Sequence, residues 1–123
     1  MSHPTKTELT ILKALWAKSP LSAREIHKEI GPLLEWSFST TRTTLSRMVE
    51  KSLLVPSSQH GVRVYTTAQS KARVLSGVMR EFFDTVLEMK GPLPTAAFHD
   101  SDMLSEEEWA ELDTYLNAER DDD

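Results

Sequence analysis

Hydroxyl and guanidinium side chains recur at close spacing between residues 36 and 54, in the stretch WSFSTTRTTLSRMVEKSLL. Within it, Thr40, Arg42, Thr43 and Arg47 lie within two helical turns of one another. Arginine can donate two parallel hydrogen bonds to guanine or to a phosphate, and threonine can contact phosphates or the thymine methyl group. These residue types at this spacing predict a helix that reads a polyanion, and the major groove of DNA fits them.

A helical wheel divides this stretch into an apolar side and a polar side. Phe38, Thr41, Leu45, Met48, Val49 and Ser52 share the apolar side. Thr40, Thr43, Arg47, Glu50 and Lys51 fall opposite, with Arg42 and Ser46 at the boundary. We expect Thr40, Thr43 and Arg47 to face bases, and Ser39, Arg42 and Lys51 to serve the flank and the phosphates. An ordinary surface helix with a few arginines would show the same wheel.

Two shorter helices are expected in front of this one. The first covers Thr7–Lys18 and the second begins at Ser22, each opened by a capping box, Thr5 with Glu8 and Ser22 with Glu25. Gly31 and Pro32 are expected to stop the second helix. The short connections predict a helix-turn-helix arrangement. Ser22, at a helix N-terminus, is a candidate phosphate contact through the backbone amides of its turn.

A β-hairpin is expected directly after the arginine-bearing helix. Leu53–Val55 reads as a strand, Ser57–Gly61 as a turn, and the second strand places Val62 and Val64 on one face and Arg63 and Tyr65 on the other. A hairpin in this place is the wing of a winged helix. Arg63 is then a candidate contact to a minor groove or a phosphate, unless it is a solvated strand residue.

The second half of the chain predicts a helical region with wide apolar stripes. A long helix is expected over Ala68–Glu88, and a third capping box, Ser105 with Glu108, opens a last helix. The stripes could form a core, a cofactor pocket or an oligomer interface. Pairing across a two-fold axis is favoured, because it would bury both stripes and place two reading helices on successive half-sites. The predicted dimerisation residues are Leu75, Val78, Met79, Phe82, Phe83, Val86, Leu87, Trp109, Leu112 and Leu116.

Charge and composition narrow the function further. The net charge is −5, but residues 1–75 carry eleven Lys and Arg against five Glu, and residues 76–123 carry three against fourteen Asp and Glu. A basic front half suggests that this end meets the polyanion. The histidines are scattered, cysteine is absent, and no metal-ligand spacing or glycine-rich phosphate loop occurs. We therefore expect no enzyme, metal or cofactor, and, without a secretory or membrane-spanning segment, a cytoplasmic protein.

This order of parts resembles the penicillinase-repressor family of winged-helix transcriptional regulators, which includes the β-lactamase and methicillin-resistance repressors and copper-responsive relatives. The stretch from Trp36 to Leu54 is similar to the recognition helix of the family, with Thr40, Arg42, Thr43 and Arg47 in its Thr-x-Arg-Thr-x-x-x-Arg pattern. Leu15-Trp16 and the strand Val62–Tyr65 also match. The resemblance implies a homodimer that represses transcription at a pseudo-palindromic operator.

Departures from the family pattern concern sequence preference and induction. Ser39 stands where some members have lysine, and the absence of cysteine excludes copper sensing through a Cys-x-Cys pair. In β-lactam-responsive members, induction cuts an Asn–Phe bond; the similar place here is Ala97-Phe98, without the asparagine. Proteolytic release, with a membrane-sensor protease as partner, is therefore a hypothesis that rests on the resemblance.

The expected fold is mainly α with a small β-hairpin: a winged helix-turn-helix followed by a helical dimerisation region. Residues 1–70 are expected to bind double-stranded DNA and residues 71–123 to form the homodimer. Two alternatives stay open at this point. One is a winged-helix module that binds proteins instead of DNA, and the other is a regulator that responds to a small ligand.

Overall fold

The computed structural model describes residues 4–89, 91, 93 and 95–121. The chain divides into two compact units, residues 1–69 and 70–123, and each is described separately. The assignment of DNA binding to the first and of dimerisation to the second stays a prediction.

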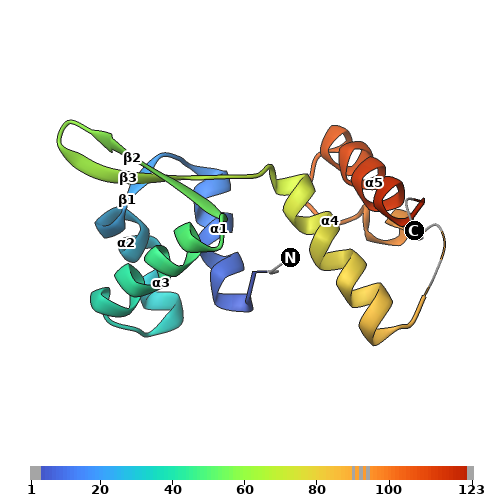
Figure 1. The fold of residues 1–123 in the computed structure, drawn as a ribbon, viewed down its shortest axis with the longest axis horizontal. Coiled ribbons are helices and arrows are strands. Elements are labelled where there is room, and N and C mark those ends of the chain that lie inside the picture. The colour runs from blue at the N-terminus through green and yellow to red at the C-terminus, as the bar shows by residue number, and fades with distance from the viewer. Residues whose placement is uncertain (1–3, 90, 92, 94, 122–123) are drawn as a thin grey trace. The chain divides into compact units, whose positions relative to one another are not determined.

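Three helices and a three-stranded sheet make up the first unit (Figure 1). Its elements are α1 (Lys6–Ala17), β1 (Leu21–Ser22), α2 (Ala23–Leu34), α3 (Phe38–Glu50), β2 (Leu54–Gln59) and β3 (Val62–Thr67). Thr5 and Ser22 cap α1 and α2, and each capping box is formed, with Glu8 and Glu25 bonding back to the cap residue. This is the predicted winged helix-turn-helix.

The sheet has one strand more than the predicted hairpin. Its order is β1-β3-β2, all antiparallel, with Leu21 opposite Tyr65 and Pro56 on the other side of Tyr65. The turn is tighter than predicted: Ser57–Gln59 belong to β2, and only His60 and Gly61 turn, both at positive φ. Two successive residues at positive φ match the right-handed twist of the strands they join.

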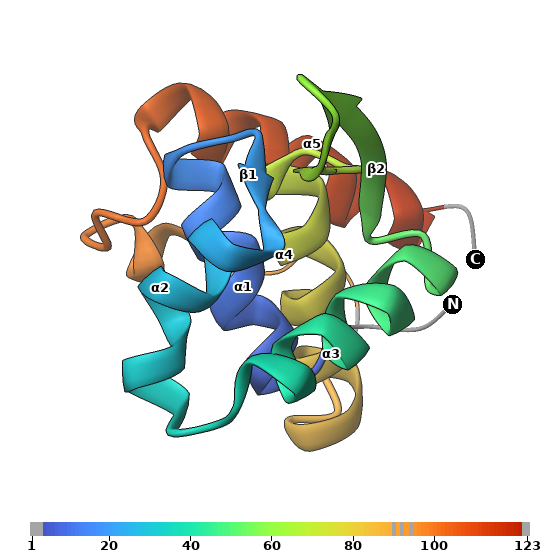
Figure 2. The ribbon, with the colours of Figure 1, turned by 90° about the vertical axis from the view of Figure 1, so that its left-hand side faces the viewer.

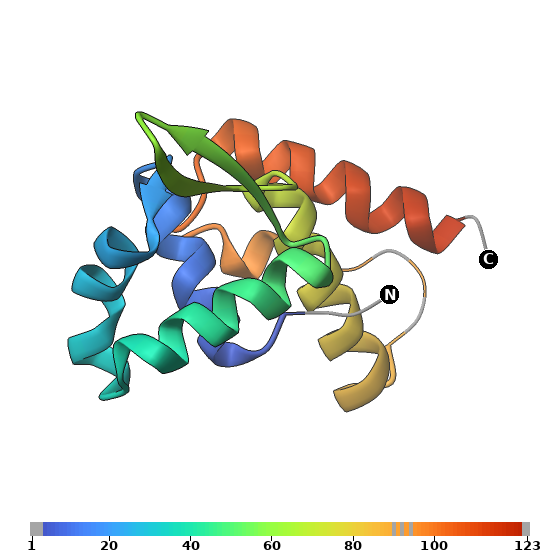
Figure 3. The same ribbon diagram turned by 60° about the vertical axis from the view of Figure 1, so that its left-hand side comes forward.

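Burial in β3 departs from the predicted alternation. Val64 and Tyr65 are both buried, whereas Val62 is exposed. Val64 and Tyr65 lie where β3 is paired on both edges, with β1 and β2, and where α1 and α2 pack against the strand, whereas Val62 lies beside the turn and is exposed. The hairpin projects from the helical part of the unit, as Figure 3 shows.

The predicted end of α2 was wrong. The helix continues through Gly31 and Pro32 to Leu34 and ends at Glu35, which takes a left-handed conformation and donates its amide to the Gly31 carbonyl over 2.8 Å. Proline in the last turn forfeits one intrahelical hydrogen bond, which leaves the remaining bonds intact. Gly31 is needed because a Cβ there would lie 2.7 Å from Cε1 of His27.

The core of the first unit forms where the three helices and the sheet meet. Every predicted apolar stripe contributes buried side chains to it: Ile11, Leu12, Leu15, Ile26, Ile30, Leu45, Met48, Leu54 and Val64. Figure 2 shows α3 in front of this unit, with β2 rising from its C-terminal end. Because one side of α3 is used in this packing, its other side is left for the surface.

The second unit is helical. It contains α4 (Lys71–Glu81), a π-helical turn η1 (Phe82–Val86), a 3-10 turn η2 (Thr95–Phe98) and α5 (Glu106–Asp121). The long predicted helix is therefore shorter at both ends as an α-helix and changes to wider π-type winding at Phe82. Ser105 and Glu108 form the third predicted capping box, with hydrogen bonds of 2.9 and 3.2 Å.

A small core joins α4 to α5. Its buried members are Ala72, Phe83, Leu93, Leu104, Trp109, Leu112 and Leu116. Two contacts between side chains join the start of α4 to the first turns of α5: Lys71 lies 3.4 Å from Glu108, and Ser70 donates to Glu111 over 3.4 Å. The two apolar stripes thus cover each other in one chain, at least in part.

Candidate nucleic-acid interface

Helix α3 presents the hydroxyl and guanidinium groups on one side. Ser37 caps it by accepting from the Thr40 amide over 3.2 Å, and Thr41, Leu45 and Met48 are buried, as the wheel predicted. A helix fixed by this buried side must turn the opposite side outward. The exposed residues there are Ser39, Thr40, Arg42, Thr43, Ser46, Arg47 and Glu50.

A groove of about 470 Å³ lies between α3, the start of α2 and β3. It is lined by Ala23 of α2, by Ser39, Arg42, Thr43 and Ser46 of α3, and by Arg63 and Tyr65 of β3. None of the described residues that line it is acidic. The groove therefore offers two arginines and several hydroxyl groups from three elements to a single polyanionic ligand.

The groove brings together some predicted contact residues and omits others. Ser39, Arg42, Thr43 and Arg63 meet in it, while Thr40 and Arg47 are exposed on α3 outside its lining. Arg42, expected at the flank, lies beside Thr43 in the lining. Ser46 also lines the groove but was not among the predicted contacts. Its spacing from Ser39 and Arg42, at seven and four residues, places all three on one helical face.

The guanidinium groups of this region carry uncompensated charge. Within the described part of the chain, Arg42, Arg47 and Arg63 form no ion pair with a carboxylate. The aromatic rings beside two of them are uncharged: Arg42 Cζ lies 6.0 Å from the centre of the Phe38 ring, and Arg63 Cζ 5.9 Å from that of Tyr65. Cations without an internal partner are available to phosphates or base edges.

Lys51, by contrast, has a partner. Its Nζ lies 2.6 Å from Glu8 Oε1, and its side chain is 26% exposed. Burial of Glu8 acts to raise the pKa of that carboxyl, but hydrogen bonds from Lys51 and from the Thr5 amide outweigh burial and leave the pKa below its ordinary value. An ammonium group has three hydrogens, so one bond to Glu8 leaves two donors for the predicted phosphate contact.

Ser22 is also engaged locally. Its Oγ accepts from the Glu25 amide over 3.2 Å, and its own amide donates to Glu25 Oε1 over 2.9 Å. The hydrogen bond from the Ser22 amide lowers the pKa of Glu25, so this carboxylate stays ionised at the start of α2. Any phosphate bound at this turn would use the amides that follow Ser22, and that role stays a prediction.

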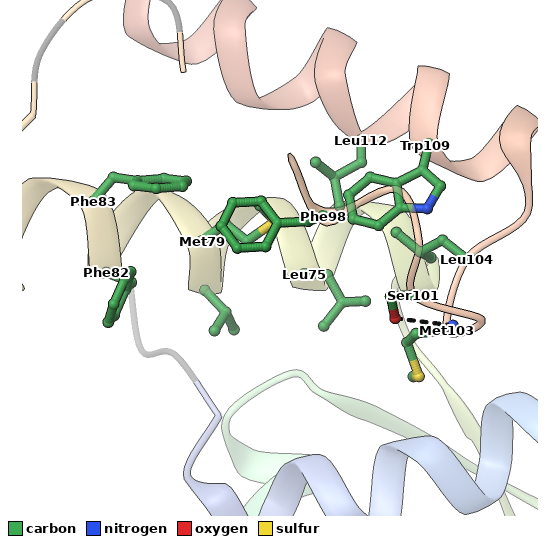
Figure 4. A pocket seen from close by; sticks show the side chains of 11 residues that line it. Leu75, Met79, Phe82, Phe83, Phe98, Ser101, Met103, Leu104, Trp109 and Leu112 are labelled. Atoms are coloured by element: carbon green, nitrogen blue, oxygen red, sulfur yellow. Dashed lines mark hydrogen bonds between the residues drawn. The ribbon is translucent and has the colours of Figure 1, made fainter. Parts of the chain in front are cut away.

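The second unit holds an apolar groove of about 360 Å³ (Figure 4). Its lining comes from α4 and η1 (Leu75, Val78, Met79, Phe82 and Phe83), from η2 and the segment after it (Phe98, Ser101, Met103 and Leu104), and from α5 (Trp109 and Leu112). Figure 4 shows Phe83 turned toward α5 and Phe82 turned away from it. Phe83 is accordingly 3% exposed and Phe82 48%.

The structure divides the predicted dimerisation residues into three sets. Phe83, Trp109, Leu112 and Leu116 are buried in the core of their own unit. Leu75, Val78 and Met79 are half-buried at the groove. Phe82, Val86 and Leu87 are exposed apolar side chains.

The predicted cleavage position lies on the surface. Ala97 and Phe98 are exposed and belong to η2, which is attached to α5 by a hydrogen bond from the Thr95 hydroxyl to Asp113. Among residues 4–89, 91, 93 and 95–121, no three metal-binding side chains gather to hold an ion. Over the same ranges, no helix has the length and apolarity needed to cross a bilayer.

Comparison with known proteins agrees with this geometry. Residues 4–118 match the model of the penicillinase repressor family. The chain is also similar to an uncharacterized 16.5 kDa protein in the ptsI 3′ region of Latilactobacillus sakei, with 23% identity over 114 residues that cover 93% of this chain and 78% of the relative. Members of the family are DNA-binding repressors of transcription and not enzymes. Because the match spans nearly its whole length, this chain belongs to the penicillinase repressor family.

Proposed function

We propose that the protein is a homodimer that represses transcription by placing one α3 in each half of a pseudo-palindromic operator. The observation that carries this proposal is the polar groove between α3 and β3. Arg42 and Arg63 line this groove, and neither pairs with a carboxylate of the described part of the chain. Direct base readout by α3 and a phosphate contact by the hairpin are the usual division of labour in such a module.

The charge distribution supports DNA as the ligand. The front half of the chain is basic, although the whole chain carries a net charge of −5. Each phosphate contact releases condensed counterions, so binding is expected to weaken steeply as salt is raised. A winged-helix module that binds proteins would not be retained on DNA even at low salt, which separates the two functions.

The second unit supports a dimer. Phe82, Val86 and Leu87 are exposed apolar residues next to an apolar groove of about 360 Å³. Apolar surface of this kind is expensive to leave in water, and a self-complementary contact across a two-fold axis would cover it in both copies at once. The same two-fold symmetry would place the α3 of the second copy on the other half of the operator.

Selection of bound sites from random double-stranded DNA tests the proposed function. The full-length protein should enrich two related half-sites about 10 base pairs apart, or a multiple of that distance, in inverted orientation. Retention of the protein on a DNA column at low salt is the accompanying measurement. Lack of retention there would instead support the protein-interaction module.

Proteolytic release is a further part of the proposal. A cut between Ala97 and Phe98 would separate α4 from α5, and α5 supplies Trp109, Leu112 and Leu116 to the core of the unit. Loss of that core would remove the dimer surface. Intact-mass measurement in cells that express a membrane-sensor protease should reveal a fragment ending at Ala97 on induction. Derepression with the chain intact would count against this route.

A further inference from the structure

We propose that Arg24, on the first turn of α2, is an additional contact to a DNA phosphate and that the ring of Phe38 holds it in position. The inference rests on the proposed function, since it adds a backbone contact to the same DNA interface. Neither residue stood out in the sequence as a contact, because Arg24 lies outside the arginine-bearing stretch and Phe38 belongs to its apolar side.

The guanidinium group of Arg24 lies over the ring of Phe38. Arg24 Cζ lies 4.2 Å from the centre of the Phe38 ring, well within the range of a cation–π interaction. Arg42 Cζ lies 6.0 Å from the same ring. One aromatic ring at the start of α3 therefore gathers two guanidinium groups from two helices at the edge of the groove.

The ring of Phe38 is held in place by His27. His27 packs edge-on against Phe38, with 5.5 Å between ring centres, and His27 Nδ1 is 2.8 Å from the hydroxyl of the buried Thr41. Gly31 leaves the space that the His27 ring occupies. Because His27 is anchored from both sides, Phe38 is a firm platform, and a guanidinium stacked on it loses little freedom when it binds.

The positive charge of Arg24 is not neutralised within the described part of the chain. Arg24 is exposed, and in the described part of the chain it pairs with no carboxylate; its neighbour Glu25 is committed to the Ser22 amide. The positive end of the helix dipole makes the first turn of α2 an unfavourable place for a cation. An external anion would give the Arg24 guanidinium group a partner and would offset its repulsion from the helix dipole.

The start of α2 borders the polar groove. In helix-turn-helix proteins the first helix of the motif crosses the phosphate backbone while the second enters the groove. Here Ala23, the residue before Arg24, lines the same groove as Arg42 and Arg63. A phosphodiester oxygen at the rim of that groove is the anion that the planar guanidinium group of Arg24 would bind.

The test measures binding of the full-length protein to selected operator DNA and to random DNA over a series of salt concentrations. For Arg24→Ala, the slope of log affinity against log salt should fall by about 0.9, with the same fold loss on both DNAs, because one phosphate contact is removed. The matched control is Arg73→Ala, since Arg73 stacks on Tyr115 at 5.5 Å in the second unit; its slope should not change.

The positioning role of Phe38 needs its own variants. Phe38→Tyr keeps the ring and should bind as the wild type does, whereas Phe38→Leu should lose affinity on both DNAs. In the Arg24→Ala background, Phe38→Leu should cost less than it does in the wild type, because only the more distant Arg42 still meets the ring. Melting temperatures show whether each variant is folded, and Phe38→Tyr keeps the test decisive if Phe38→Leu does not fold.

The outcomes separate this inference from the function on which it rests. An unchanged salt slope for Arg24→Ala, with the wild type still bound to its operator, overturns the phosphate contact and leaves the repressor function standing. An equal fall for Arg73→Ala, or a full additional loss for Phe38→Leu without Arg24, also counts against it. If the wild type binds no DNA at all, the proposed function and this inference fail together.

Discussion

The Lys51 ammonium group donates a hydrogen bond to Glu8 Oε1 over 2.6 Å and so joins the end of α3 to the first turn of α1, across 43 positions of sequence. Glu8 also accepts from the Thr5 amide over 2.8 Å, which makes it both a helix cap and an ion-pair partner. The angle of α3 in the unit is thus fixed at its C-terminal end by a residue near the start of the chain.

Glu8→Gln should destabilise the first unit. The glutamine keeps an acceptor for Thr5 but loses the charge opposite Lys51, and a hydrogen bond to a charged group is worth about 1.5–3 kcal/mol. Urea denaturation at neutral pH measures the free energy of unfolding. The matched control is Glu25→Gln, since Glu25 closes the same kind of capping box without a lysine bonded to it; it should cost less.

The stability difference between wild type and Glu8→Gln should depend on pH. Folding lowers the pKa of Glu8 below its ordinary value of 4.5, so the stabilisation is present above pH 4.5 and is lost as the pH falls through the lower folded value. The two unfolding free energies should therefore converge in acid. If the unfolding free energies of the two proteins kept a constant difference down to low pH, the charge of the Glu8 carboxylate would not be the source of the stabilisation.

Lys51→Gln should reduce both stability and salt dependence. Removal of the ammonium group leaves Glu8 without its cation, and it also removes the predicted phosphate contact, which would lower the salt slope of DNA binding by about 0.9. Fluorescence anisotropy over a salt series provides the slope. If the variant lost stability but kept the salt slope of DNA binding, Lys51 would position α3 without contacting a phosphate.

Arg42→Ala and Arg47→Ala should differ from each other. A residue that reads a base loses about 1–3 kcal/mol on the operator and relaxes selectivity at one position. Because Arg42 lines the groove and Arg47 lies outside its lining, we expect the larger loss of discrimination from Arg42→Ala. The measurement is the ratio of operator to random-DNA affinity for each variant. A larger loss of discrimination from Arg47→Ala would show instead that Arg47 reads a base and that Arg42 contacts the flank.

Phe82→Asp should produce folded monomers. Its side chain is 48% exposed, so an aspartate there disturbs little inside one chain but opposes burial against a second copy. Leu112→Asp should instead unfold the second unit, because Leu112 is fully buried. Sedimentation equilibrium and circular dichroism distinguish the two, with Leu33→Asp as the control, an exposed leucine of the first unit. A dimer that survives Phe82→Asp would exclude this surface.

Local sequence was sufficient wherever the interacting groups lie within one helical turn. All three capping boxes, at Thr5, Ser22 and Ser105, formed as predicted, because each joins residues three positions apart. The buried side of α3 followed from the spacing of Thr41, Leu45 and Met48, since a helix with one apolar side can pack in only one orientation. The family likewise could be recognised from the α3 stretch.

Contacts between distant segments could not be read in this way. The sequence shows that Glu8, Lys51, Arg24 and Phe38 exist, but not that α1 meets the end of α3 or that a guanidinium of α2 rests on a ring of α3. The two-residue strand β1 was missed for the same reason, as it is a strand only through its pairing with β3.

The neighbouring pair Phe82 and Phe83 shows the difference most simply. Both belong to the apolar pattern that predicted a helix here, and both lie in a helical turn. Packing against α5 then buries Phe83 and leaves Phe82 on the surface, because adjacent residues of a helical turn point in different directions. Periodicity in a sequence specifies which side chains are apolar together, whereas the partner that each one meets depends on how the helices pack.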